Sequence, residues 1–173
     1  MATAIETPTN MLNADNLQIR PPLPGELGWL VQVHTEFYAR EFGWLEVFEC
    51  LVAEIVVDYL KSDFRDRQAC FIAEVAGTPV GSVMLTRNSQ DEGKLRVLFV
   101  TEEARGRGVA NKLIAALLEK ARDFGYSSVM LLTTNNQLVA REIYRKFGFS
   151  LASTSPNTTF APGSTDELWR LHL

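Results

Sequence analysis

Residues 94–134 constrain the fold more than any other part of the chain. The apolar run 94–100 is followed by an Arg-Gly-Arg-Gly loop, an amphipathic stretch at 109–125 and a second apolar run at 128–134. Apolar residues in the middle stretch recur at helical spacing, and each apolar run has the length of a buried strand. Parallel strands need a crossover of this kind, so the segment predicts a strand–helix–strand unit within a sheet.

The other expected elements place this unit in a mixed sheet. Strands are predicted at 17–20, 69–75, 80–86 and 166–173, and helices at 24–43, 45–63 and 137–149. The predicted order is one strand, two helices, three strands, the crossover helix, a strand, a helix and two strands, which is an α/β or α+β arrangement. We find no long linker, so residues 17–173 are expected to form a single domain. Residues 1–16 are expected to form a tail.

Composition excludes several classes of protein. The net charge of the 173 residues is −4, which disfavours wholesale nucleic-acid binding. No apolar run reaches the roughly 18 residues that a membrane span needs, and the first residues lack a signal-peptide pattern, so a cytoplasmic protein is predicted. Cys50 and Cys70 are too few for a disulfide framework, form no metal-binding motif and are expected to be reduced and largely buried.

The turn at 105–110, Arg-Gly-Arg-Gly-Val-Ala, indicates an anion site. A helix N-terminus has unpaired N–H groups and a partial positive charge. Gly106 and Gly108 would let the backbone approach a phosphate, and Arg105 and Arg107 would add donors. The turn lacks the Gly-Lys-Ser/Thr of a P-loop and the three glycines of a dinucleotide fingerprint. A pyrophosphate site is one interpretation, and a helix start whose glycines only permit close packing is the other.

Two motifs resemble those of the GCN5-related N-acetyltransferase (GNAT) family. Arg-x-x-Gly-x-Ala at 105–110 is similar to the family's acyl-CoA signature, and "AREIYRKFGF" at 140–149 is similar to its Ala-x-x-x-Tyr-x-x-x-Gly-Phe segment. The order of elements over 17–173 is similar too. The resemblance implies a mixed, largely antiparallel sheet with splayed central strands and flanking helices. It also implies acetyl-CoA as cofactor, with its pyrophosphate held by Arg105, Gly106, Arg107, Gly108, Val109 and Ala110.

The resemblance also assigns the reacting end of the cofactor. The pantetheine arm would bind the main chain of Leu98, Phe99 and Val100, and the Leu98 N–H would polarise the acetyl carbonyl. Tyr144 would be the general acid that returns a proton to the CoA thiolate, since a phenol with a pKa near 10 suits a leaving group of similar basicity. The alternative for Tyr144 is a tyrosine that packs its helix against the sheet.

Two positions depart from the family's pattern. Lys94 stands where some members carry a catalytic Glu, so another group or a water chain must accept the proton of the amine. The family often has an Asn after the strand that follows the crossover helix, where it contacts pantetheine, and the resemblance gives this role to Asn135 and Asn136. The usual position of that Asn, three residues before Ala140, holds Gln137 instead.

The acceptor site is expected on the first helix. His34, Tyr38 and Glu41 share one helix face. His34 is a candidate base whose pKa Glu41 would raise, and a structural histidine is the alternative. Trp44 and Phe48, together with Tyr38 and Glu41, would suit a cationic amine.

Further acceptor-side features are left open by the sequence. Arg96 either points into the cleft or forms a buried ion pair, and the loop 153–167 is expected to shape the pocket. Glu46 and Glu49 suit an ordinary solvated helix face. Residues 34–59 resemble the acceptor-side helices of acetyltransferase domains fused to MarR-type regulators.

The leading hypothesis is an enzyme that moves an acetyl group from acetyl-CoA to a primary amine of a small molecule or peptide. The amine would attack directly in a ternary complex, without a metal. A non-catalytic acyl-CoA sensor is the second hypothesis, favoured by the missing Glu. A P-loop-like nucleotide binder is the third, opposed by the missing Lys-Ser/Thr. Homodimers are common in the family, and nothing in the sequence specifies one.

Overall fold

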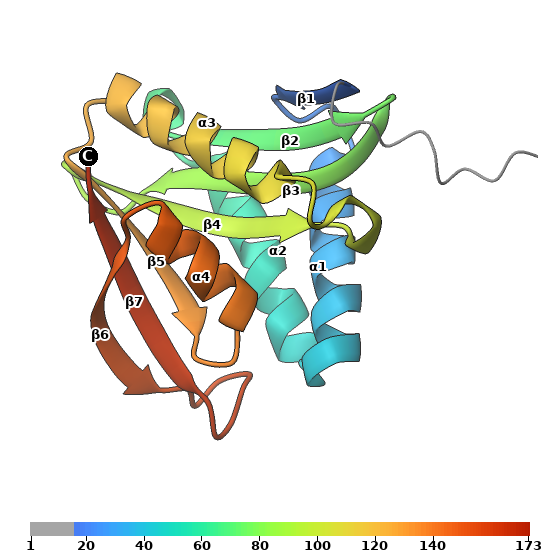
Figure 1. Cartoon of the computed structure of the whole chain (residues 1–173), viewed down its shortest axis with the longest axis vertical. Coiled ribbons are helices and arrows are strands. Elements are labelled where there is room, and N and C mark those ends of the chain that lie inside the picture. The colour runs from blue at the N-terminus through green and yellow to red at the C-terminus, as the bar shows by residue number, and fades with distance from the viewer. Residues whose placement is uncertain (1–15) are drawn as a thin grey trace, which may run out of the picture.

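The computed structural model describes residues 16–173 and shows one mixed sheet between two layers of helices (Figure 1). The strand order is β1-β2-β3-β4-β5-β7-β6. The strands are β1 (Leu17–Arg20), β2 (Ala69–Val75), β3 (Thr78–Arg87), β4 (Glu92–Val100), β5 (Ser128–Thr134), β6 (Ser150–Pro156) and β7 (Thr165–His172). Every neighbouring pair is antiparallel except β4 with β5, which confirms the expected sheet. The tail expected at 1–16 lies, apart from Asn16, outside the described residues.

Two apolar cores lie on opposite faces of the sheet. The helices are α1 (Glu26–Phe42), α2 (Glu46–Lys61), α3 (Val109–Asp123) and α4 (Leu138–Lys146), with short 3-10 turns η3 (Arg65–Arg67) and η4 (Glu102–Ala104). In Figure 1, α3 and α4 lie in front of the sheet and α1 and α2 behind it. Leu113 and Leu117 of α3 are fully buried in the front core, and Leu30 and Val52 occupy the rear core. The apolar stripes of these helices therefore face the sheet, as their helical spacing predicts.

The crossover unit has the predicted parallel pairing, but the pairing is short. Glu92 to Leu95 of β4 pair with Ser128 to Leu131 of β5, and no further pairs follow between these strands. β4 contains a bulge at this point, because its register against β3 shifts and Val97 adopts a positive φ of 46°. The Ser82 hydroxyl donates to the Val97 carbonyl at 3.1 Å and holds the bulge. The central strands therefore separate beyond residue 95, which confirms the expected splay.

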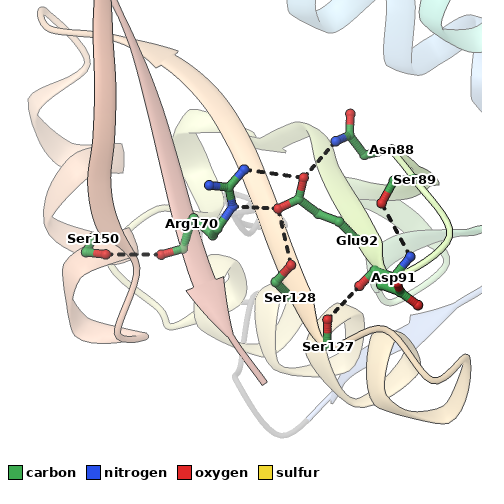
Figure 2. Close-up of polar contacts among 8 residues, drawn as sticks. All are labelled: Asn88, Ser89, Asp91, Glu92, Ser127, Ser128, Ser150 and Arg170. Carbon is green, nitrogen blue, oxygen red and sulfur yellow. Dashed lines mark hydrogen bonds and ion pairs between the residues drawn. The ribbon is translucent and has the colours of Figure 1, made fainter.

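A carboxylate joins the strands at the paired end of β4 and β5. Figure 2 shows that the Arg170 Nε donates to Glu92 at 2.6 Å, while Asn88 Nδ2 and Ser128 Oγ donate to the same carboxylate at 2.7 and 3.2 Å. Burial alone would raise the pKa of Glu92, but these hydrogen bonds outweigh it and hold the pKa below its ordinary value. Glu92 thus connects β4 with β5 and β7 where the sheet is closed.

Two expectations from the sequence were wrong in part. The loop expected at 153–167 begins inside β6 and ends inside β7. Every residue of β6 is exposed, so this edge strand shows no apolar alternation that would reveal it. Cys70 is buried as expected, and burial raises the pKa of its thiol to about 12. Cys50 is exposed instead, on the outer side of α2.

Two absences concern residues 16–173 only. None of their helices has the length and apolarity to cross a membrane. None of their His, Cys, Asp and Glu side chains form a group of three or more that could hold a metal ion.

Candidate functional site

A cavity of about 310 Å³ lies where β4 and β5 separate. Its walls combine α1 and α2 from the rear face with Ala140 and Tyr144 of α4 from the front face. Residues 94–98 of β4 and 132–134 of β5 form the rest of the wall, together with Gln137, Phe160 and Asp166. Because helices from both faces line it, the cavity reaches into the gap between the strands. A ligand in this cavity could therefore contact the main chain of β4 and side chains from both helix layers.

The glycine turn lies between the end of β4 and the start of α3. Gly106 and Gly108 have φ of 73° and 78°, a left-handed conformation that favours glycine. A Cβ at either position would meet no other atom within 4 Å, so close packing is not what these glycines serve. Among residues 16–173, no side chain caps the N-terminus of α3 by a hydrogen bond. The turn therefore presents the first backbone N–H groups of α3 at an open surface, as an anion site requires.

Arg105 holds the turn against β4. Its Nε donates to the Val100 carbonyl at 3.1 Å, and its guanidinium lies 4.4 Å from the centre of the Phe37 ring. Arg107 is exposed, Val109 is buried at the first position of α3, and Ala110 follows it half-buried. The contacts of Arg105 therefore fix the position of the glycine turn relative to β4 and α1.

Tyr144 is the phenol that α4 brings to the cavity. Its side chain is buried, and its ring packs edge-on to Phe149 at 5.9 Å. Burial raises the pKa of Tyr144 well above its usual value, and the nearby Tyr38 adds to this effect. Burial also raises the pKa of Tyr38 to about 12, opposed by Arg105. Both hydroxyls therefore keep their protons at neutral pH, which leaves Tyr144 able to donate one.

His34 is buried on α1 and lines the same cavity. Its Nδ1 lies 2.8 Å from the Leu30 carbonyl, so Nδ1 carries the proton and donates it. Nε2 is buried without a hydrogen-bond partner among the described residues. Burial lowers the pKa of His34 to about 4, against the effect of the Leu30 carbonyl. The ring is thus neutral at physiological pH, with a lone pair on Nε2.

The expected pairing of His34 with Glu41 is wrong. Glu41 is exposed in the last turn of α1, forms an ion pair with Arg40 at 2.9 Å and does not line the cavity. His34 and Glu41 lie on one face of α1, but this face is exposed to solvent at the C-terminal end of the helix. The Glu41 carboxylate therefore stays hydrated and avoids the cost of burial. Glu41 therefore belongs neither to the base nor to the amine site in this structure.

An aromatic wall forms on the α1 and α2 side of the cavity. Tyr38 and Trp44 are stacked with ring centres 5.0 Å apart, and Phe48 lies 4.7 Å from Tyr38. Phe160, from the segment between β6 and β7, packs at 4.7 Å from Trp44. Tyr38, Trp44 and Phe48 were expected at the acceptor site from the sequence, whereas Phe160, a single aromatic residue in a polar segment, was not. No periodic signal marks such a residue.

Two cations on β4 also line the cavity. Lys94 and Arg96 form no ion pair with any residue among 16–173, so the buried ion pair considered for Arg96 is not found there. Burial and, to a smaller extent, Arg96 lower the pKa of Lys94 to about 8. Burial lowers the pKa of Arg96, and Asp58 opposes this shift. Arg96 thus points into the cleft, which was the other expectation.

Asn135 and Asn136 lie outside the cavity. Asn135 accepts a hydrogen bond from the Thr165 N–H through Oδ1 at 3.0 Å, and its own N–H donates to the Thr165 carbonyl at 2.9 Å. Asn136 accepts from the Thr134 hydroxyl. These contacts close the turn after β5, so the expected pantetheine contact is not what these side chains make here. Thr134 and Gln137 line the cavity instead.

Comparison with known sequences identifies one family. The sequence model described as "Acetyltransferase (GNAT) family" matches residues 30–149. Human N-acetyltransferase 8 is 34% identical over 119 residues, which are 65% of this chain and 52% of that protein. N-acetylaspartate synthetase of Xenopus tropicalis is 30% identical over 134 residues, 76% of this chain and 49% of that protein. The chain thus spans about half the length of the curated relatives it matches.

Solved structures share the whole fold. A ribosomal-protein-alanine N-acetyltransferase from Brucella melitensis superposes with a TM-score of 0.73 at 20% identity, over 90% of this chain and 99% of that one. A GCN5-related N-acetyltransferase from Kribbella flavida gives 0.75 at 17%, over 93% and 100%. A Salmonella typhimurium structure that contains its cofactor acetyl-CoA gives 0.73 at 14%, over 91% and 94%. At these identities the likeness establishes the fold.

Proposed function

The chain belongs to the acetyltransferase (GNAT) family, and we propose that it transfers an acetyl group from acetyl-CoA to a primary amine of a small molecule or peptide. The observation that carries this proposal is the cavity between the separated strands. A thioester must meet the amine in a space that exposes the β4 main chain and a proton donor together. The cavity provides both, because residues 94–98 and Tyr144 share its wall.

The cofactor is proposed to extend from the glycine turn to the cavity. The backbone N–H groups at 106–110 would hold the pyrophosphate, supported by the open left-handed glycines and the uncapped helix. The main chain of Leu98 to Val100 would bind the pantetheine arm, since β5 no longer pairs with β4 there. The relative with acetyl-CoA in its structure shares this fold.

The chemistry needs a polarised carbonyl, a proton acceptor and a proton donor. We assign the Leu98 N–H to the carbonyl oxygen, where charge develops as the amine attacks. We assign proton acceptance to the unprotonated Nε2 of His34, directly or through water, and proton donation to Tyr144. With a pKa of about 4, His34 would place the acid limb of the rate profile near that pH. Collapse of the tetrahedral adduct breaks the carbon–sulfur bond, and Tyr144 protonates the thiolate.

The proposal includes three further features that rest on the sequence alone. A cytoplasmic location, a homodimer and a special closeness to acetyltransferase domains fused to MarR-type regulators are each proposed from the sequence. Sedimentation of the purified protein would test the dimer. The competing sensor hypothesis ends with turnover of any amine, since a sensor binds acetyl-CoA without consuming it.

Calorimetric titration with acetyl-CoA tests the cofactor site. We expect saturable binding by the wild-type protein and at least tenfold weaker binding by Gly108→Trp, because the side chain would occupy the anion site. Gly77→Trp is the matched control. Gly77 also has a positive φ, 81°, with no atom within 4 Å of a Cβ, but it lies in the β2–β3 turn. Both variants therefore carry similar backbone strain, about 1–2 kcal/mol.

The control separates lost binding from lost folding. Retained affinity in Gly77→Trp with loss in Gly108→Trp supports the pyrophosphate site. Equal affinities in the two variants would place the pyrophosphate elsewhere. If the folded wild-type protein binds no acetyl-CoA, the proposed activity is wrong, and membership of the family then describes the fold alone.

A further inference from the structure

The cavity wall carries two positive charges that the described protein does not neutralise. Lys94 and Arg96 alternate along β4 and therefore lie on the same face of the sheet, toward α2. The acidic side chain on this wall, Asp166, accepts a hydrogen bond from Asn157 Nδ2 at 2.7 Å and makes no ion pair with either cation. Asp58 attracts Arg96 across a neighbouring cavity without ion-pair contact. Two like charges thus share a half-buried site.

Buried polar atoms without partners on this wall indicate the chemistry of the ligand that it would bind. The Nε of Arg96 is buried without a partner among the described residues, and its side chain lines the cavity. The Nε2 of Gln137 is buried without a partner there too, but Gln137 stands where the family contacts pantetheine, so the cofactor would satisfy that donor. Buried donors and charges are costly unless an acceptor or counter-charge satisfies them. Burial and, to a smaller extent, the Arg96 charge lower the pKa of Lys94 to about 8, so the site itself disfavours this positive charge. The wall is therefore complementary to an anion with acceptor oxygens.

The pyrophosphate of the cofactor is too far away to be this anion. Arg96 precedes Val100 by four residues of strand, which is about 13 Å at roughly 3.3 Å per residue. The glycine turn begins beyond Val100. By contrast, Arg96 is two residues from Leu98, a main-chain separation of at most about 7 Å, so the Arg96 side chain can reach an anion close to the proposed acetyl carbonyl. That separation suits an anionic group on the same small molecule as the attacking amine.

We propose that the acceptor is an amine that also carries a carboxylate, with Arg96 and Lys94 binding the carboxylate and the aromatic wall enclosing an apolar side chain. The fitting class is an amino acid with an aromatic or aliphatic side chain. Tyr38, Trp44, Phe48 and Phe160 supply the apolar surface. An Arg guanidinium can hold a carboxylate with two parallel hydrogen bonds, which also orients the amine. This inference rests on the proposed acetyl transfer, and it replaces the cationic acceptor site expected from Glu41.

Matched pairs of amines test the carboxylate. The pairs are L-phenylalanine with 2-phenylethylamine, L-tryptophan with tryptamine, and L-leucine with 3-methylbutylamine, assayed by CoA release at saturating acetyl-CoA. We expect kcat/KM to favour the carboxylate-bearing member at least tenfold in one or more pairs. In Arg96→Met this preference should vanish through a higher KM for the amino acid. Arg122→Met, which removes an exposed cation near the end of α3, should keep the preference.

A ligand without an amine gives a readout independent of turnover. We expect 3-phenylpropanoate to bind the CoA-bound enzyme in calorimetry and the neutral 3-phenylpropanamide to bind at least tenfold more weakly. Lys94 should lose its proton near pH 8, so affinity for the carboxylate should fall above that pH in the wild type. Lys94→Met should bind more weakly throughout and lack this fall. The other titratable groups that face this wall are His34, Tyr38, Tyr144, Asp166 and, across the neighbouring cavity, Asp58. Burial lowers the pKa of His34 to about 4 and raises the pKa of both tyrosines, so these three groups do not change charge near pH 8.

The outcomes separate this inference from the proposed function. Equal or better use of the plain amines in every active pair overturns the carboxylate site, as does a preference that survives Arg96→Met. Absence of both amino-acid turnover and 3-phenylpropanoate binding overturns it too. Acetyl-CoA binding with turnover of plain amines alone would keep the acetyltransferase and remove the inference. Failure to bind acetyl-CoA would remove the proposed function, and calorimetry of 3-phenylpropanoate with the free protein would still report on the anion site.

Discussion

Burial decides which proton each residue of the cavity can move. Removing Tyr144 and Tyr38 from water favours their neutral forms and keeps both phenols protonated. The same effect acts in the opposite sense on His34, whose neutral form is also favoured. The same apolar environment therefore keeps Tyr144 as a proton donor and leaves His34 Nε2 with a free lone pair, and both residues line the cavity. This division of roles needs no charged residue at the reacting centre.

Tyr144→Phe tests the donor. We expect kcat to fall about 100-fold or more, because the thiolate would leave without a positioned acid. Affinity for acetyl-CoA should change less than threefold, since phenylalanine keeps the ring that packs against Phe149. Steady-state kinetics and calorimetry on the same preparation give both numbers.

The neighbouring phenol supplies the control. Tyr38→Phe removes a hydroxyl from the stacked aromatic wall and should alter acceptor KM more than kcat. If Tyr144→Phe turns over as fast as the wild type, Tyr144 is a packing residue. If both variants lose kcat equally, the two hydroxyls act together and no single donor can be assigned.

Sequence patterns located the residues that belong to a motif and missed those that act through tertiary contacts. Tyr144 was expected because "AREIYRKFGF" resembles a segment of the family in which a Tyr stands four residues before the Gly-Phe pair. Gln137 departs from the family's Asn and was not among the expected site residues, yet it lines the cavity. Glu41 was expected at the site from helical spacing alone. Spacing gives the face of a helix but not where that face meets solvent, and only packing decides that.

At the level of elements, the strand pairing of β4 changes along its length. Its first residues pair on both sides, with β3 and with β5, while its later residues pair with β3 alone after the bulge at Val97. A bulge commonly redirects a strand near a functional site. The sequence predicted the bounds of β2 and β5 to the residue, because both are rich in apolar and β-branched residues and are bounded by turn residues. It could not predict the bulge, since a valine with positive φ has no sequence signature.

Glu92→Gln tests how firmly the paired end of β4 is held. Glutamine keeps the shape but removes the charge that Arg170 contacts at 2.6 Å, so we expect a loss of about 1.5–3 kcal/mol in the free energy of unfolding at pH 7. The folded-state pKa of Glu92 is lowered from 4.5, so its contribution is complete above that value. The contribution disappears as the pH falls through the lowered pKa. Urea unfolding at pH 7 and at pH 3 measures both.

The adjacent carboxylate provides the comparison. Asp91 is exposed and takes part in Figure 2 through its main chain, so Asp91→Asn removes a charge without removing these contacts. This variant should lie within about 0.5 kcal/mol of the wild type. A difference for Glu92→Gln that is equally large at pH 3 and pH 7 would show that shape, and not charge, accounts for the effect.

For the molecule as a whole, the cleft divides the sheet into two parts that meet along a short seam. β1 to β4 form one part and β5, β6 and β7 the other, and the seam is the parallel pairing of residues 92–95 with 128–131. The Glu92–Arg170 ion pair crosses the seam at 2.6 Å. Beyond it, the cavity separates the strands. A cofactor bound in this gap would therefore contact both parts and replace the strand pairing that they lack.

Hydrogen exchange measures this bridging directly. With acetyl-CoA bound, we expect slower exchange at residues 97–100 and 106–110, because their N–H groups would gain partners on the cofactor. Labelling for seconds to minutes reports local opening before global unfolding contributes. Residues 72–75 of β2, paired on both sides, should be unchanged at these times and serve as the internal control. Gly108→Trp should show no protection at the same acetyl-CoA concentration. Protection confined to α1 and α2, with none at 97–100, would mean that the cofactor binds on the rear face and that the gap between β4 and β5 is not its site.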